Sequence, residues 1–142
     1  QVITQSDIDA VVAVLRSDFL TQGPQVPLLE SALAEYCGAS HAVAVNSATS
    51  ALHIACLALG LSEGDWLWTT PTTFVASANC VRYCNGEVVF ADIEPNTYLI
   101  DYFSVKKLLE SSPIGTYQGI ILVDFAGHAV DLEKFNIFNP SE

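Results

Sequence analysis

HAVAVNSATSAL, residues 41–52, joins two different patterns of hydrophobic spacing. Residues 41–45 are an apolar run that predicts a strand, and a helical pattern opens at Thr49. The first N–H groups of a helix point outward, and the helix dipole favours an anion there. Ser47, Ala48, Thr49 and Ser50 are therefore candidates for a phosphate site, and ordinary helix capping by Ser or Thr is the alternative.

The same two patterns alternate along the rest of the chain. Strands are predicted at 42–45, 66–69, 87–91 and 119–124, and helices at 49–59, 74–83 and 101–110, with Asp131 capping another. Apolar strands joined by helices are typical of a mostly parallel sheet with helices on both faces. The predicted fold class is therefore α/β, with ligands at the carboxyl ends of the strands.

Two helices are expected before this α/β part. Ser6, with Asp9 three residues later, resembles a capping box that opens the first helix. The second helix is expected to stop at Gly38, a residue suited to a helix end. A loop containing Gly23 separates the two helices.

Charge and composition limit the possible partners. The sequence has sixteen Asp and Glu residues and only five Lys and Arg residues. The resulting net charge of −11 argues against nucleic-acid or anionic-membrane binding. The same charge repels anionic ligands at long range, so cationic groups for such a ligand are expected to come from elsewhere. Only 15% of the residues are charged, which indicates that some faces are covered by further chain or another subunit.

The four cysteines form no CxxC pair, and the sequence opens on no signal-peptide pattern, so a cytoplasmic location is expected. Cys80 and Cys84 are one helical turn apart and would form a metal site only together with His128. Buried free thiols are the preferred interpretation, and no metal is expected. The uncharged stretch 40–62 is interrupted by polar residues, so no membrane span is predicted.

Several longer motifs occur in one fixed order. They are LTQGPQV at 20–26, EYCGASHAVAVNSATSALHIACLALGL at 35–61, WLWTTPTTFVASANC at 66–80 and VDFAGHAVD at 123–131. From about residue 3 to about residue 135 the chain resembles the DegT/DnrJ/EryC1/StrS family of sugar aminotransferases that use pyridoxal 5'-phosphate. This resemblance implies the N-terminal part of the large domain of an aspartate aminotransferase-like protein, fold type I. Residues 1–40 are expected to be a helical lead-in, and 41–142 an incomplete α/β cofactor-binding domain.

The resemblance also implies a reaction. An amino group, commonly from glutamate, passes to a UDP-linked 4-keto-6-deoxy amino sugar, as in nucleotide-sugar biosynthesis of the pseudaminic acid type. Pyridoxal 5'-phosphate is the implied cofactor, and the UDP-sugar and an amino-acid donor are the implied substrates. Members of the family are homodimers with active sites at the subunit interface, so a homodimer is expected.

Individual residues match the family's motifs. Ser47, Ala48, Thr49 and Ser50 match its phosphate-binding turn, and Phe74 matches the aromatic residue that stacks on the pyridine ring. A core phenylalanine is the alternative for Phe74. Phe19, Leu20 and Thr21 match a substrate-contacting segment, with a plain interhelical loop as the alternative. His128 is assigned no catalytic role.

No residue of this chain is assigned a catalytic role. By resemblance, the Schiff-base lysine follows residue 142, and Lys106, Lys107 and Lys134 do not match its motif. We therefore expect these 142 residues to be inactive alone. The alternative is a non-catalytic truncated fragment or interaction module that dimerises. A dinucleotide-binding oxidoreductase would require a glycine-rich turn, and residues 46–50 contain no glycine.

Overall fold

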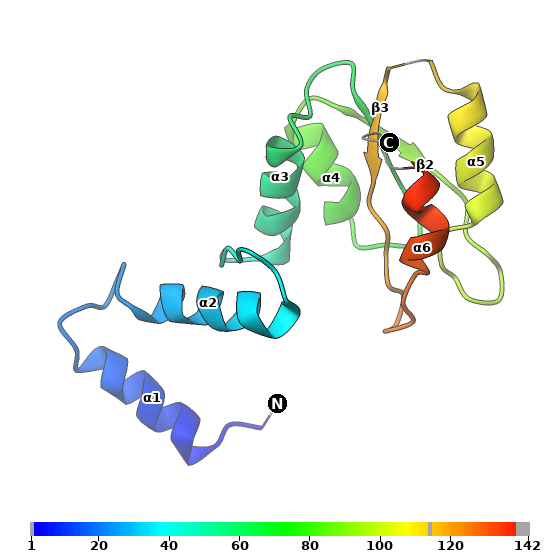
Figure 1. Ribbon diagram of the computed structural model, residues 1–142. Coiled ribbons are helices and arrows are strands. Elements are labelled where there is room, and N and C mark those ends of the chain that lie inside the picture. Colours follow the sequence, from blue (N-terminus) through cyan, green and yellow to red (C-terminus); the bar gives the residue numbers. More distant parts are fainter. Residues whose placement is uncertain (1, 114, 139–142) are drawn as a thin grey trace. The chain divides into compact units, whose positions relative to one another are not determined.

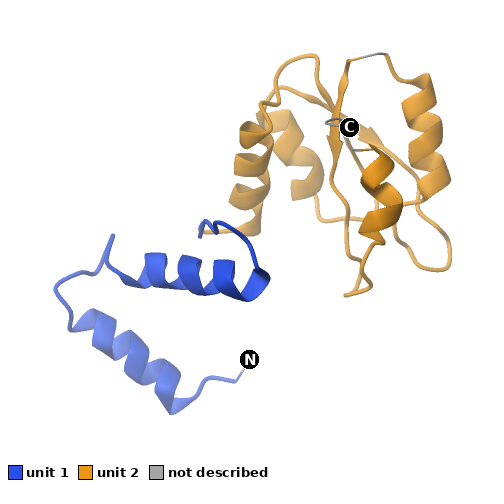
Figure 2. Cartoon of the chain, viewed as in Figure 1, with its two compact units in different colours: residues 1–45 blue, residues 46–142 orange. Residues whose placement is uncertain are grey.

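The computed structural model describes residues 2–113 and 115–138, and the chain folds as two compact units, Gln1–Val45 and Asn46–Glu142 (Figure 2). Residues 139–142, which end the second expected domain, lie outside the described residues. Within the described part, no helix has the length and apolar character needed to cross a membrane.

The first unit contains two helices, α1 (Gln5–Leu15) and α2 (Gln25–Cys37). The cap predicted at Ser6 and Asp9 is wrong by two residues, because Thr4 is the N-cap. Asp7 Oδ2 accepts hydrogen bonds from both the backbone N–H and the hydroxyl of Thr4, each at 2.7 Å. The predicted end of α2 is confirmed, since Gly38 has a φ of 65°, which glycine adopts without strain.

The strand predicted at 42–45 is wrong. A strand requires a hydrogen-bonded neighbour, and the sheet among the described residues is built entirely from the second unit. The backbone N–H of Ala44 instead donates to Glu30 Oε1 at 2.8 Å, and the side chain of Val43 is exposed. The apolar run therefore forms an irregular segment tied to α2.

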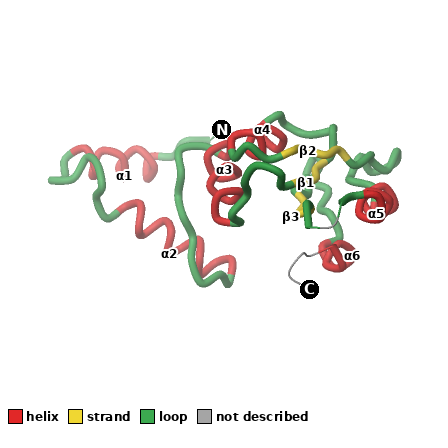
Figure 3. The backbone as a smooth tube through the Cα atoms, turned by 90° about the horizontal axis from the view of Figure 1, so that it is seen from above, coloured by secondary structure: helices red, strands yellow, loops and turns green. Residues whose placement is uncertain are grey.

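The second unit alternates helices and strands. Its elements are α3 (Ala48–Ala58), β1 (Trp66–Thr69), α4 (Ala76–Tyr83), β2 (Glu87–Phe90), α5 (Tyr102–Ser111), β3 (Tyr117–Ile120), α6 (Leu132–Phe135) and a 3-10 turn (Asn136–Phe138). The strands are parallel in the order β2-β1-β3 (Figure 3), with Trp68 opposite Val89 and Ile120. The strand predicted at 119–124 is only partly right, because β3 begins two residues earlier, ends four residues earlier and is half-buried.

Helices cover both faces of this sheet, as predicted. α3 and α4 enclose one cluster and α5 and α6 the other (Figure 1). The first cluster contains Cys56, Leu61, Leu67, Cys80, Val81 and Cys84. The second contains Trp68, Ala91, Ile100, Val105, Val130, Phe135 and Phe138.

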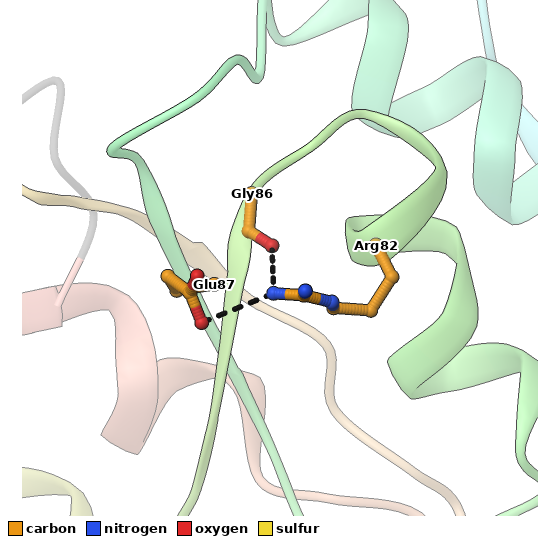
Figure 4. Close-up of polar contacts among 3 residues, drawn as sticks. All are labelled: Arg82, Gly86 and Glu87. Atoms are coloured by element: carbon orange, nitrogen blue, oxygen red, sulfur yellow. Dashed lines mark hydrogen bonds and ion pairs between the residues drawn. The ribbon is translucent and has the colours of Figure 1, made fainter.

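The turn between α4 and β2 fixes the path of the chain into β2. Arg82 Nη1 donates to the carbonyl of Gly86 and pairs with Glu87 Oε2, both at 3.1 Å (Figure 4). Asn85 has a φ of 61°, and a side chain at Gly86 would crowd Val81 and the carbonyl of Asp65. Because the ion pair is exposed, it contributes little to stability. The close approach at Gly86 favours a residue without a side chain at this turn.

Candidate active site

Three segments of the second unit meet the carboxyl edge of the sheet. Because the strands are parallel, they end on one edge, so residues 70–74 after β1 lie on the same side as residues 124–128 after β3. α3 begins at this same edge, which brings residues 47–50 to it (Figure 1). We call these three segments the carboxyl edge.

The start of α3 is an N-cap with free donors. Ser47 is extended, with φ −162° and ψ 157°, and its Oγ accepts from the backbone N–H of Ser50 at 3.2 Å. The Ser50 hydroxyl donates to Asn46 Oδ1 at 2.7 Å. Helix geometry leaves the N–H groups of Ala48 and Thr49 without intrahelical acceptors. Helix capping and anion binding are therefore compatible here, because they use different N–H groups.

Phe74 does not belong to the hydrophobic core. It directly precedes the first turn of α4, and 74% of its surface is exposed. The alternative of a core phenylalanine is therefore wrong for this unit. An exposed aromatic ring at a sheet edge offers a flat apolar face to a planar ligand.

A pair of hydroxyl groups beside Phe74 was not identified from the sequence. Thr73 Oγ1 and Ser77 Oγ lie 2.8 Å apart, and Ser77 is buried. Thr70, also buried, accepts from the N–H of Thr72 at 3.3 Å. The signal is the four-residue spacing of Thr73 and Ser77 across a helix start.

The segment after β3 is a tight turn. The N–H of His128 donates to the carbonyl of Phe125 at 2.9 Å, and Ala126 and Gly127 both have positive φ, 51° and 81°. Asp124 Oδ1 accepts from the N–H of Val130 at 2.9 Å, which closes the loop. Asp124 therefore holds the backbone, and His128 is exposed.

Phe19, Leu20 and Thr21 lie in the loop between α1 and α2 of the first unit. All three are exposed, and a Cβ at Gly23 would lie 2.8 Å from Phe19 Cβ, so the turn requires glycine. The loop therefore has a defined local shape. Its role toward a substrate stays a prediction.

The buried thiols have no acid-base role. Burial in the cluster under α3 and α4 raises the pKa of Cys56 to about 12 and also raises that of Cys80. Both thiols are therefore protonated at neutral pH and are poor nucleophiles and ligands. No group of three or more potential metal ligands occurs within residues 2–113 and 115–138.

Comparison of the sequence with known families gives one extended match. The model of the DegT/DnrJ/EryC1/StrS aminotransferase family matches residues 1–138. UDP-4-amino-4,6-dideoxy-N-acetyl-beta-L-altrosamine transaminase of Campylobacter jejuni is 43% identical over 137 residues, 96% of this chain and 35% of that protein. The spore coat polysaccharide biosynthesis protein SpsC of Bacillus subtilis is 39% identical, over 92% of this chain and 33% of that protein.

Solved structures show the same relationship. Spr1654 of Streptococcus pneumoniae, a sugar aminotransferase candidate, superposes in its PLP form with a TM-score of 0.85 and 32% identity, over 94% of this chain and 33% of that one. PseC of Helicobacter pylori, an aminotransferase involved in pseudaminic acid biosynthesis, superposes with a TM-score of 0.81 and 37% identity. The match covers 94% of this chain and 35% of that one. The chain spans about a third of the length of the curated relatives it matches.

Proposed function

The chain belongs to the DegT/DnrJ/EryC1/StrS aminotransferase family, and we propose that the complete protein is a pyridoxal 5'-phosphate-dependent aminotransferase of nucleotide-sugar biosynthesis. The 43% identity with a UDP-amino-sugar transaminase carries this proposal. The substrate is a UDP-linked 4-keto-6-deoxy amino sugar, and glutamate supplies the amino group and leaves as 2-oxoglutarate. PseC, matched over 94% of this chain, supports a reaction of the pseudaminic acid type.

The carboxyl edge fits this cofactor. The N–H groups of Ala48 and Thr49 point outward at the start of α3, where the helix dipole favours a phosphate. The side chains of residues 47–50 are small, so a phosphate reaches the backbone closely. Phe74 presents an exposed ring at the same edge. Pyridoxal phosphate, when bound, supplies the electron sink for amino transfer, and these residues hold its phosphate and shield one ring face from water.

The remaining groups come from outside these 142 residues. A net charge of −11 disfavours anionic ligands at a distance, although a helix N-terminus acts within its first turn and distant charges are screened within about 8 Å. Cationic groups are therefore supplied by the rest of the protein. The Schiff-base lysine comes from there too, because Lys106, Lys107 and Lys134 do not match its motif. It follows that this segment is inactive by itself.

Phe19, Leu20 and Thr21 form part of the sugar pocket, and the complete protein is a homodimer. The exposed apolar side chains of α1 and α2 support a dimer. They include Ile8, Val11, Leu15, Leu28, Leu29 and Leu33. None of the residues of either helix is buried within this chain, so their apolar faces are free for a subunit contact.

These same faces favour a second candidate function, an interaction module that dimerises without catalysis. It predicts a dimer of the 142-residue chain, whereas the aminotransferase predicts turnover by the complete protein. The two candidates therefore differ in an activity that is measured directly.

The test uses the complete protein made from its native gene. It is incubated with pyridoxal phosphate, glutamate and a UDP-linked 4-keto-6-deoxy amino sugar. The products are separated by chromatography, and mass spectrometry identifies and quantifies them. We expect the UDP-amino sugar and 2-oxoglutarate in equal amounts, and neither product from the 142-residue chain. If the complete protein transfers no amino group from glutamate or any other amino-acid donor while the 142-residue chain forms a dimer, the aminotransferase proposal is wrong and the interaction module is favoured instead.

A further inference from the structure

Phe74 has little to hold its ring in place. With 74% of its surface exposed, it lacks the neighbours that fix a side chain within a core. The direction of its Cα–Cβ bond is therefore set by the backbone between β1 and α4. Any group that immobilises this backbone also limits the directions in which the ring points.

Three polar contacts restrain this backbone, one before Phe74 and two that connect it to α4. Before Phe74, Thr70 accepts from the N–H of Thr72 at 3.3 Å. Across it, Thr73 Oγ1 and Ser77 Oγ lie 2.8 Å apart, while the N–H of Ser77 donates to the carbonyl of Phe74 at 3.0 Å. Ser77 is only 7% exposed, so water is a poor substitute for its partner.

We propose that Thr73 and Ser77 are positioning residues, whose paired hydroxyls fix the turn before α4 and so orient Phe74 for stacking on the cofactor ring. This inference rests on the proposed function. Without the pair, only the backbone bond from Ser77 to the Phe74 carbonyl still connects this turn to α4, and Phe74 samples more orientations before binding. Binding must then restrict a more mobile ring, and this loss of conformational entropy weakens cofactor affinity.

The variants separate the hydroxyl from the shape of the side chain. Thr73→Val keeps the branched shape and removes the hydroxyl, Ser77→Ala removes the partner, and Thr73→Ser is the control that keeps the hydroxyl. The dissociation constant of pyridoxal phosphate is measured for the complete protein by absorption titration, together with the visible circular dichroism of the bound cofactor. We expect about fivefold weaker binding and a reduced dichroic signal for Thr73→Val and for Ser77→Ala, the effect of one lost hydrogen bond. Thr73→Ser keeps wild-type values, and the double variant is no weaker than either single variant.

A second set of variants excludes a purely structural role. In a Phe74→Ala background, we expect Thr73→Val to cause no further loss of cofactor affinity, because the residue it positions is absent. Equal losses in both backgrounds, or wild-type affinity and dichroism for Thr73→Val, would overturn the proposal. If the wild-type protein binds the cofactor and only the variants behave unexpectedly, the proposed function stands. A wild-type protein that binds no pyridoxal phosphate overturns both.

Discussion

Leu67 and Trp68 are consecutive residues of β1 that pack into different hydrophobic clusters on opposite faces of the sheet. Leu67 is 1% exposed and packs beneath α3 and α4, whereas Trp68 is 0% exposed and packs beneath α5 and α6. Side chains alternate along a strand, so this short strand contributes to both clusters. β1 is thus the central strand of the sheet, and residues 70–74 of the carboxyl edge follow it directly.

Truncation of Leu67 should therefore be severe. We expect Leu67→Ala to reduce the free energy of unfolding by about 2–5 kcal/mol, the usual effect of a cavity in a core. Leu57→Ala is the matched control, because Leu57 is 56% exposed on α3 and should change stability by only about 0.5 kcal/mol. Urea unfolding of the 142-residue chain, followed by the fluorescence of Trp66 and Trp68, measures both. Similar losses for the two variants would show that Leu67 is not a core residue.

The cysteines should differ sharply in reactivity. Cys37 is exposed, whereas Cys56 and Cys80 are buried and their raised pKa values keep them protonated. Iodoacetamide at pH 8 should label Cys37 in the folded chain and reach Cys56 and Cys80 only after unfolding. Peptide mass spectrometry at successive times gives the rate at each site. Labelling of Cys56 as fast as Cys37 would contradict the buried cluster.

Alkaline pH should weaken the fold. Burial raises the pKa of Cys56 from 9.0 to about 12 and that of Tyr117 from 10.0 to about 12. Between these limits the folded state keeps protons that the unfolded state releases, so the free energy of unfolding falls as pH rises from about 9 toward 12. Unfolding in urea at a series of pH values measures this slope, and a rising stability would contradict it.

Tyr117→Phe isolates the contribution of the phenol to that slope. The Tyr117 hydroxyl is buried and has no hydrogen-bond partner among the described residues, so its removal loses no bond. We expect near-wild-type stability at pH 7 and a shallower decline above pH 10 than in the wild type. A slope above pH 10 equal to that of the wild type would exclude Tyr117 as a contributor.

Local sequence signals predicted much of the second unit. The strand at 66–69 and the cap at Asp131 are confirmed, since Asp131 Oδ1 accepts from the N–H of Lys134 at 3.3 Å. A capping residue and the N–H group that it accepts from are close in sequence, so the cap can be predicted from the local sequence. The run at 42–45 was not predictable in this way. Whether an apolar run becomes a strand depends on hydrogen-bonding partners remote in sequence, and Glu30 supplies the acceptor for Ala44 instead.

The candidate site divides along the same line. Ser47 is found as an N-cap because the pattern of small residues before a helix is local. The exposure of Phe74 could not be predicted from the local sequence, because burial depends on the packing of the entire unit. The general preference of phenylalanine for buried positions favoured the core instead. The turn formed by Ala126 and Gly127 places an alanine at positive φ, which local preference disfavours. Such positions require the surrounding structure to hold them.

The central claim is that backbone N–H groups at the start of α3 hold the cofactor phosphate, and Ala48→Pro tests it most directly. Ala48 is the first residue of α3, where proline is well tolerated, and the extended Ser47 before it suits a proline. The variant thus removes one N–H donor and leaves the helix intact, while Ala48→Ser keeps the donor as a control. In the complete protein we expect Ala48→Pro to bind pyridoxal phosphate at least about tenfold more weakly, the effect of a lost bond to a charged group, with an unchanged melting temperature. Wild-type affinity in a folded Ala48→Pro variant would contradict the account.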